Sequence, residues 1–158
     1  MSDTDSVPMA GRSDADLPGH WLLARLGKRV LRPGGQFVLD DNMAPEDDAL
    51  DAFMNRFEQW RDPSHVRACR LSEWQGWIES AGMEVVHTDP LRSKSFGFAP
   101  WVERLPMPPG ERERFEAWLR SAPEECRETF GVRVPNGEIE AIATMYAIVL
   151  ARKPEAQA

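Results

Sequence analysis

The segment that most constrains the fold is the run Met145-Tyr146-Ala147-Ile148-Val149-Leu150-Ala151 near the carboxyl end of the chain. It is apolar at almost every position and contains β-branched and aromatic residues, which favour extended backbone. A strand that is apolar on both sides belongs in the middle of a sheet whose two faces are covered. We therefore expect a central strand over residues 143–152 of an α/β protein.

Two further strands are predicted upstream of this segment. Phe37-Val38-Leu39 is a short apolar run between the turn Pro33-Gly34-Gly35 and the polar run Asp40-Asp41-Asn42, which is the pattern of a short strand. Residues Met83 to Thr88 follow a helical pattern that ends at a glycine. The sequence thus predicts a three-stranded sheet with strands over 36–41, 83–88 and 143–152.

The other apolar residues recur mostly at helical spacing. A helix over residues 17–32 should end before Pro33, and a second should begin with Pro45 at its first position. Ser72 and Gln75 have the spacing of a capping box for a third helix. Phe96 to Pro109 is rich in Pro and aromatics and is predicted to be irregular, with one helical turn at Trp101.

Composition limits the kind of protein this is. Residues 1–16 carry few apolar side chains, so we expect a disordered tail there, one folded unit over 17–154 and a short tail over 155–158. The chain has 19 Lys and Arg against 26 Asp and Glu and no basic stretch, so nucleic acid is not expected as a partner. No apolar run reaches the roughly 20 residues that span a bilayer, and no signal peptide is recognisable. A cytoplasmic protein without membrane contact is the expectation. Cys and His residues show no metal-ligand spacing, and no metal is expected.

The run Arg29-Val30-Leu31-Arg32-Pro33-Gly34-Gly35-Gln36-Phe37-Val38-Leu39-Asp40-Asp41 resembles a motif of class I S-adenosylmethionine-dependent methyltransferases. The resemblance is to the ubiquinone/menaquinone methyltransferase-like group, the methyltransferase type 11 family. It continues through Asn42-Met43-Ala44-Pro45-Glu46-Asp47, Arg61-Asp62-Pro63-Ser64-His65-Val66-Arg67 and Leu71-Ser72-Glu73-Trp74. It implies a partial Rossmann-like fold in which residues 143–152 form the family's antiparallel seventh strand, between the fifth and the sixth. The chain is thereby identified as the carboxyl-terminal half of such an enzyme, with the cofactor-binding half missing.

The resemblance also implies S-adenosylmethionine as cofactor and a small-molecule methyl acceptor. The family holds the cofactor on a glycine-rich turn after its first strand, with an acidic residue at the end of the second, and neither motif is present here. Gly34-Gly35 precedes a strand, whereas a turn that cradles a nucleotide follows a strand and begins a helix. We identify no cofactor-binding residue and expect the chain not to be competent alone.

Asp40, Asp41 and Asn42 end the first predicted strand, at the rim where open α/β sheets bind ligands. By resemblance this rim faces the methyl acceptor, and Asp41 and Asn42 are candidate residues of the substrate pocket. The alternative is that Asp and Asn stand here for Asx-turn chemistry before the next helix.

A second group of candidates lies further along the chain. His65 is the candidate catalytic base, because a loop histidine near a carboxylate such as Asp62 titrates close to neutral pH; alternatively it caps a helix end or fixes the loop. Arg61 would receive an acidic substrate or belong to a solvated face. Trp101 would form an apolar lid over the pocket or a satellite of the core.

Two functions follow as hypotheses. One is a methyltransferase whose cofactor half comes from elsewhere; the other is a non-enzymatic, degenerate half-domain that serves as a binding or interaction module. In both cases the strand over 36–41 has an edge that the family's fourth strand would cover. We expect an N-terminal methyltransferase half or a second copy of the chain to pair there.

Overall fold

The computed structural model describes residues 19–156, so the predicted tail over 1–16 lies outside the described residues. The elements are α1 (Gly19–Val30), β1 (Gln36–Ala44), α2 (Asp48–Arg61), β2 (Cys69–Arg70), α3 (Leu71–Ser80), β3 (Glu84–Thr88), β4 (Arg92–Gly97), α4 (Phe98–Val102), α5 (Glu111–Arg120), α6 (Glu124–Thr129), the 3-10 turn η2 (Pro135–Gly137) and β5 (Ala141–Arg152).

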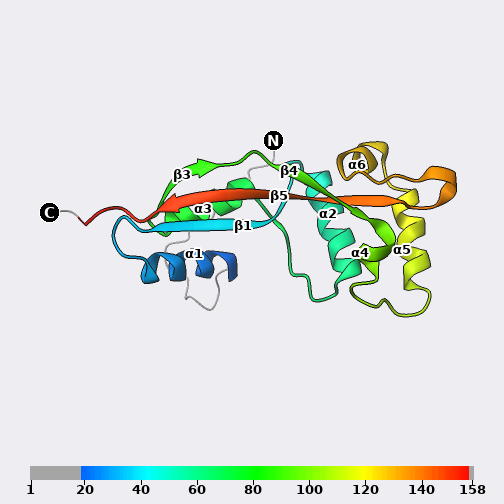
Figure 1. Cartoon of the computed structure of the whole chain (residues 1–158), viewed down its shortest axis with the longest axis horizontal. Coiled ribbons are helices and arrows are strands. Elements are labelled where there is room, and N and C mark those ends of the chain that lie inside the picture. The colour runs from blue at the N-terminus through cyan, green and yellow to red at the C-terminus, as the bar shows by residue number, and fades with distance from the viewer. Residues whose placement is uncertain (1–18, 157–158) are drawn as a thin grey trace, which may run out of the picture.

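The long strand β5 organises the sheet (Figure 1). On one side it pairs antiparallel with β1, from Gln36 opposite Arg152 to Asn42 opposite Tyr146. On its other side it pairs antiparallel with β3 and then with β4. β2 adds to the far edge of β1 in parallel, with Met43 opposite Cys69. The prediction of a mixed α/β sheet whose last strand is central and antiparallel is confirmed.

The predicted count of three strands is wrong, because β2 and β4 complete a sheet of five. β4 was missed because its side chains are mostly polar and only its pairing with β5 makes it a strand. The amide of Asp89 donates to the carbonyl of Ile148 at 2.9 Å and carries the chain from β3 to β4 along the same edge. The segment expected to be irregular from Phe96 therefore begins as strand and helix, and β1 runs on to Ala44 instead of ending at Asp41.

Two apolar clusters pack against the sheet. The first lies between the sheet and the pair α1 and α3, with Leu39, Trp74 and Val149 among its buried members. The second is rich in aromatics and gathers side chains of α2, α4, α5 and α6 with residues at the start of β5. Figure 1 shows these four helices together at one end of the molecule and α1 with α3 towards the other. Burial of this apolar surface is the main stabilising term of the fold.

The helix starts differ from those predicted. α2 begins at Asp48, not at Pro45, because the Asp47 carboxylate caps it by accepting from the amides of Ala49 and Leu50. The predicted Ser72–Gln75 capping box is also wrong. The amide and hydroxyl of Ser72 both donate to the Glu46 carboxylate, at 3.0 and 2.6 Å. The carboxylate of Glu46, on the loop before α2, therefore ties the amino end of α3 to that of α2.

Over residues 19–156 no helix is both long and apolar enough to cross a membrane.

Candidate functional site

An open hollow of about 460 Å³ lies where β1, β4 and β5 run side by side. Asp40, Asp41 and Asn42 of β1 line it, together with Lys94 of β4 and Tyr146 of β5. Asn42 and Arg92 are both opposite Tyr146 in the pairing registers, so the three share one row across the sheet. The guanidinium of Arg92 lies 5.5 Å from the centre of the Tyr146 ring. The hollow is therefore built from neighbouring strands, which hold its side chains on a rigid base.

The hollow offers a carboxylate, an amide, an ammonium group and a phenol to a ligand. Such a set can accept and donate hydrogen bonds and suits a small polar molecule. The Asp41 carboxylate also accepts a hydrogen bond from the amide of Asn42 at 2.8 Å. The local bonding and the exposed rim, which were the two alternatives for these residues, therefore occur together. Sequence reasoning found Asp41 and Asn42 but missed Lys94 and Tyr146. The single tyrosine in an apolar strand was the available signal for Tyr146, whereas Lys94 required knowledge of β4.

The other four predicted site residues do not line this hollow. Arg61 ends α2, Asp62 and His65 follow it on the loop, and Trp101 belongs to α4. His65 Nε2 lies 3.3 Å from the side-chain oxygen of Asn55. The Asp62 carboxylate accepts from the amide and the hydroxyl of Ser64, and these bonds lower the pKa of Asp62. The sequence candidates thus form two separate groups.

Trp101 and Arg61 form a packed pair in this second group. Trp101 is only 3% exposed and its ring lies 6.1 Å from that of Phe57. Arg61 lies 4.7 Å from the centre of the Trp101 ring and pairs with the buried carboxylate of Glu58 at 3.0 Å. This geometry is that of a core residue covered by a cation, which favours the core alternative for Trp101. A catalytic or substrate role of this group stays a prediction.

A network that the sequence did not reveal fixes the loop between α2 and β2. The side chain of Asn55 accepts from the amide of Ala68 at 2.6 Å and donates to its carbonyl at 3.0 Å. The neighbouring carboxylate of Asp51 is buried and receives hydrogen bonds from Arg67 and Arg70. A hydrogen bond to Glu73 is the main cause that raises the pKa of Arg67. His65 belongs to this network through Asn55, which favours its loop-fixing alternative.

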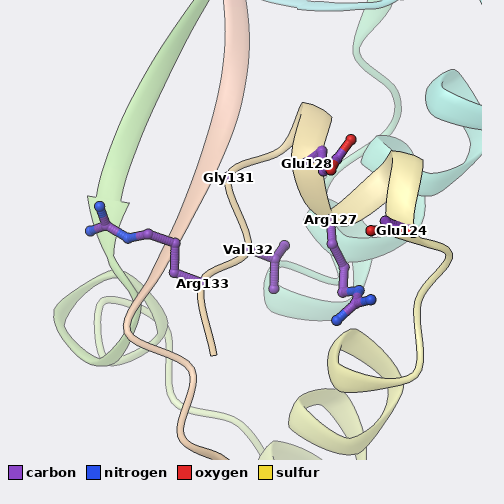
Figure 2. A pocket seen from close by; sticks show the side chains of 6 residues that line it. All are labelled: Glu124, Arg127, Glu128, Gly131, Val132 and Arg133. Carbon is purple, nitrogen blue, oxygen red and sulfur yellow. The ribbon is translucent and has the colours of Figure 1, made fainter. Parts of the chain in front are cut away.

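A second hollow, of about 350 Å³, lies beside α6 and is lined by Glu124, Arg127, Glu128, Gly131, Val132 and Arg133. Figure 2 shows the side chains of Arg127 and Arg133 directed away from each other. The Nε atom of Arg127 is buried and has no hydrogen-bond partner among the described residues. Because its charged groups do not converge, this hollow is not a candidate for binding an anion or a cofactor.

Two proteins that are named as methyltransferases are similar to this chain. No family model matches the chain. It is 36% identical over 111 residues to a Bacillus subtilis (strain 168) protein named uncharacterized methyltransferase YcgJ, covering 70% of this chain and 44% of that protein. The solved structure of YcgJ matches with a TM-score of 0.79 at 30% identity, over 86% of this chain and 58% of the other. The solved structure of BH2331 from Bacillus halodurans C-125, whose methyltransferase assignment is itself provisional, matches with a TM-score of 0.82 at 33% identity, over 87% and 59% of the two chains.

The chain has a methyltransferase fold. It spans about half the length of the curated relatives that it matches, with 50% of the Escherichia coli (strain K12) protein YafE covered at 32% identity. The predicted resemblance to methyltransferases is therefore confirmed at the level of the fold, and the partial coverage fits the predicted carboxyl-terminal half.

The described part of this methyltransferase fold does not form a site for S-adenosylmethionine at its one Gly-Gly turn. The amide of Gly34 donates to the carbonyl of Lys153 and that of Gly35 to the carbonyl of Arg32. A Cβ atom at Gly34 would collide with the Glu155 carboxylate. Both amides are thus occupied, and the turn connects α1 to β1. Among the described residues, no group of three His, Cys, Asp or Glu could hold a metal ion.

Proposed function

We propose that the chain supplies the methyl-acceptor side of an S-adenosylmethionine-dependent methyltransferase that acts on a small molecule. The match to YcgJ and BH2331 in sequence and structure carries this proposal. The position of the hollow supports it, because its β1 residues lie near the carboxyl end of that strand, where open α/β sheets bind ligands. A cytoplasmic location remains a prediction.

The residues of the hollow would bind and orient the acceptor. Asp40 would accept a hydrogen bond from a hydroxyl or amine of the acceptor, and Asn42 would donate or accept. Lys94 would hold an acidic group, and the Tyr146 ring would limit the depth of the site. The Gly34-Gly35 turn offers no free amide to a cofactor, so no transfer step is assigned to the described residues. Positioning is the contribution of this chain.

The second candidate function is that of a non-enzymatic half-domain that binds a partner. The occupied amides of Gly34 and Gly35 favour it, because this turn then has no free amide for a cofactor. Under this alternative the hollow would have no catalytic consequence.

A chimaera of YcgJ, in which the matched segment is replaced by that of this chain, distinguishes the two functions. We expect the chimaera to bind S-adenosylmethionine and to transfer a labelled methyl group to one or more members of a panel of small polar acceptors. Asp40→Asn with Asn42→Ala should reduce transfer at least tenfold and leave cofactor binding unchanged. A folded, cofactor-binding chimaera without any transfer, on a panel that YcgJ itself methylates, would contradict the enzymatic proposal.

A further inference from the structure

The hollow between β1, β4 and β5 carries one unpaired charge of each sign. The Asp40 carboxylate and the Lys94 ammonium group both line it. Within residues 19–156 neither group forms an ion pair, either with the other or with a third residue. Lys94 lies instead beside the Phe96 ring, with its Nζ atom 5.6 Å from the ring centre. Both charges are therefore available to a ligand.

The pairing registers place these two charges in separate rows of one sheet face. Asp40 lies opposite Ile148 of β5, whereas Lys94 lies opposite Thr144. Residues directly opposite each other on paired strands, and every second residue along a strand, project from the same face of a sheet. The two charged side chains therefore share a face and are four residues apart along β5. Figure 1 shows β5 running between β1 and β4, so the charges also lie on opposite sides of that strand.

The row between the two charges has no unpaired charge of its own. Asn42 and Arg92 lie opposite Tyr146, one on each side of it. The Arg92 guanidinium lies over the Tyr146 ring and pairs with the Asp89 carboxylate, so its charge is compensated. Along this face the hollow is thus negative at one end, uncharged in the middle and positive at the other end.

The spacing of the rows sets the length of a ligand that reaches both ends. Four residues of a strand span about 14 Å. Lys94 does not shorten this span, because its ammonium group lies beside Phe96, which is opposite Ile142 and so one row further from Asp40. A hydrogen bond at each end takes up about 3 Å, which leaves about 8 Å between the two charges of the ligand. An α-amino acid, with both charged groups on one carbon, is too short.

We propose that the methyl acceptor is an elongated zwitterion, with an amine at one end, an acidic group at the other and an uncharged spacer between them. This inference rests on the proposed function, since it names the substrate class of the same hollow. The amine would bind Asp40, the acidic group would bind Lys94, and the spacer would cross the Tyr146 ring. A molecule with one charged end would form only one of the two charge-assisted hydrogen bonds, so the hollow favours the zwitterion over it.

The test is binding of 6-aminohexanoate to the 158-residue chain, followed through the amide shifts of Asp40, Lys94 and Tyr146 in an NMR titration at low ionic strength. The extended probe has about the required separation of charges. Hexanoate and hexylamine, with one charge each, and glycine, with adjacent charges, are the matched probes. We expect 6-aminohexanoate to bind at least fivefold more tightly than each of the three.

Charge reversal tests which residue binds which end of the ligand. Asp40→Lys should prefer hexanedioate, which is acidic at both ends, over 6-aminohexanoate by at least fivefold. Lys94→Glu should prefer 1,6-diaminohexane in the same way. Both positions are exposed, so the variants should fold. Glu138→Lys and Arg114→Glu reverse one charge of each sign outside the hollow and should keep the preference of the unaltered chain.

Equal binding of 6-aminohexanoate and hexanoate by the unaltered chain would overturn the proposal, as would the absence of binding by all four probes. Unchanged preferences in the folded reversal variants would equally overturn it. Should a reversal variant fail to fold, Asp40→Asn decides in its place, since it should bind 6-aminohexanoate and hexanoate equally.

Binding is measured here without methyl transfer, so the two proposals fail separately. A YcgJ chimaera that methylates only uncharged acceptors would refute the zwitterionic acceptor and leave the proposed function standing. A folded chimaera without any transfer would contradict the proposed function, whereas the preference of the hollow for 6-aminohexanoate would remain.

Discussion

The thiol of Cys69 lies in β2, almost fully buried against the sheet. Burial is the main cause that raises its pKa from an ordinary 9.0 to about 11, and the nearby carboxylate of Glu73 acts in the same direction. The folded protein therefore keeps the proton on this thiol in a range of pH where the unfolded chain loses it.

The expected consequence is a loss of stability with rising pH. Because the unfolded state releases the Cys69 proton first, the stability from this group is complete below pH 9 and falls between about pH 9 and 11. Urea unfolding at several pH values in this range should show the decline, and Cys69→Ala should flatten it. Identical slopes for the two proteins would show that the thiol is not the group responsible.

Trp101 provides a second test of an individual side chain. Trp101 packs on Phe57 and Phe115 in the core. Its replacement by alanine should therefore lower the free energy of unfolding by about 3–5 kcal/mol. If Trp101 were a lid over a pocket, the same replacement would change the free energy of unfolding little. The control Val66→Ala, at a residue that is 87% exposed, should change stability by less than about 0.5 kcal/mol. A Trp101→Ala variant as stable as this control would restore the lid interpretation.

Among the connecting elements, the loop from Asp62 to Ala68 is tied to α2 at its end by the side chain of Asn55. Asn55 satisfies both the amide and the carbonyl of Ala68, which is itself buried. We expect Asn55→Ala to cost about 1–3 kcal/mol for each group left unpaired and to speed hydrogen exchange of the Ala68 amide. Gln59→Ala, at an exposed position of the same helix, is the control. Unchanged exchange at Ala68 would mean that the loop is held by other contacts.

The elements also show what the sequence could and could not predict. β5 and β1 carry apolar runs that favour extended backbone, so both strands were found. β4 could not be found, because Arg92 and Lys94 become strand residues only through pairing with β5, distant in the sequence. For the same reason only some residues of the hollow were predicted. Asp41 and Asn42 end a strand that the sequence reveals, whereas the position of Lys94 follows only from the pairing of β4 with β5. The Asn55 network is equally non-local, since it joins positions 13 residues apart.

In the molecule as a whole, helices cover the sheet at one end and on one side. The aromatic cluster encloses the start of β5, while α1 and α3 cover the sheet further along. Val38 is 63% exposed although it lies within a run of apolar strand residues. Within residues 19–156 no strand pairs with the part of the outer edge of β1 that includes Val38, and such an edge is accessible to a further strand.

We expect the 158-residue chain alone not to bind S-adenosylmethionine appreciably. Binding of a nucleoside cofactor at a glycine turn needs unoccupied amides that face a cavity at the start of a helix. The amides of Gly34 and Gly35 are instead bonded to Lys153 and Arg32, and the helix precedes this turn. Titration calorimetry should give a dissociation constant weaker than about 100 µM, equivalent to roughly 5.5 kcal/mol of binding free energy. The YcgJ chimaera serves as the positive control under the same conditions. Tight binding by the chain alone would mean that residues outside this turn form a cofactor site, and the division of labour between an acceptor side and a separate cofactor side would then be wrong.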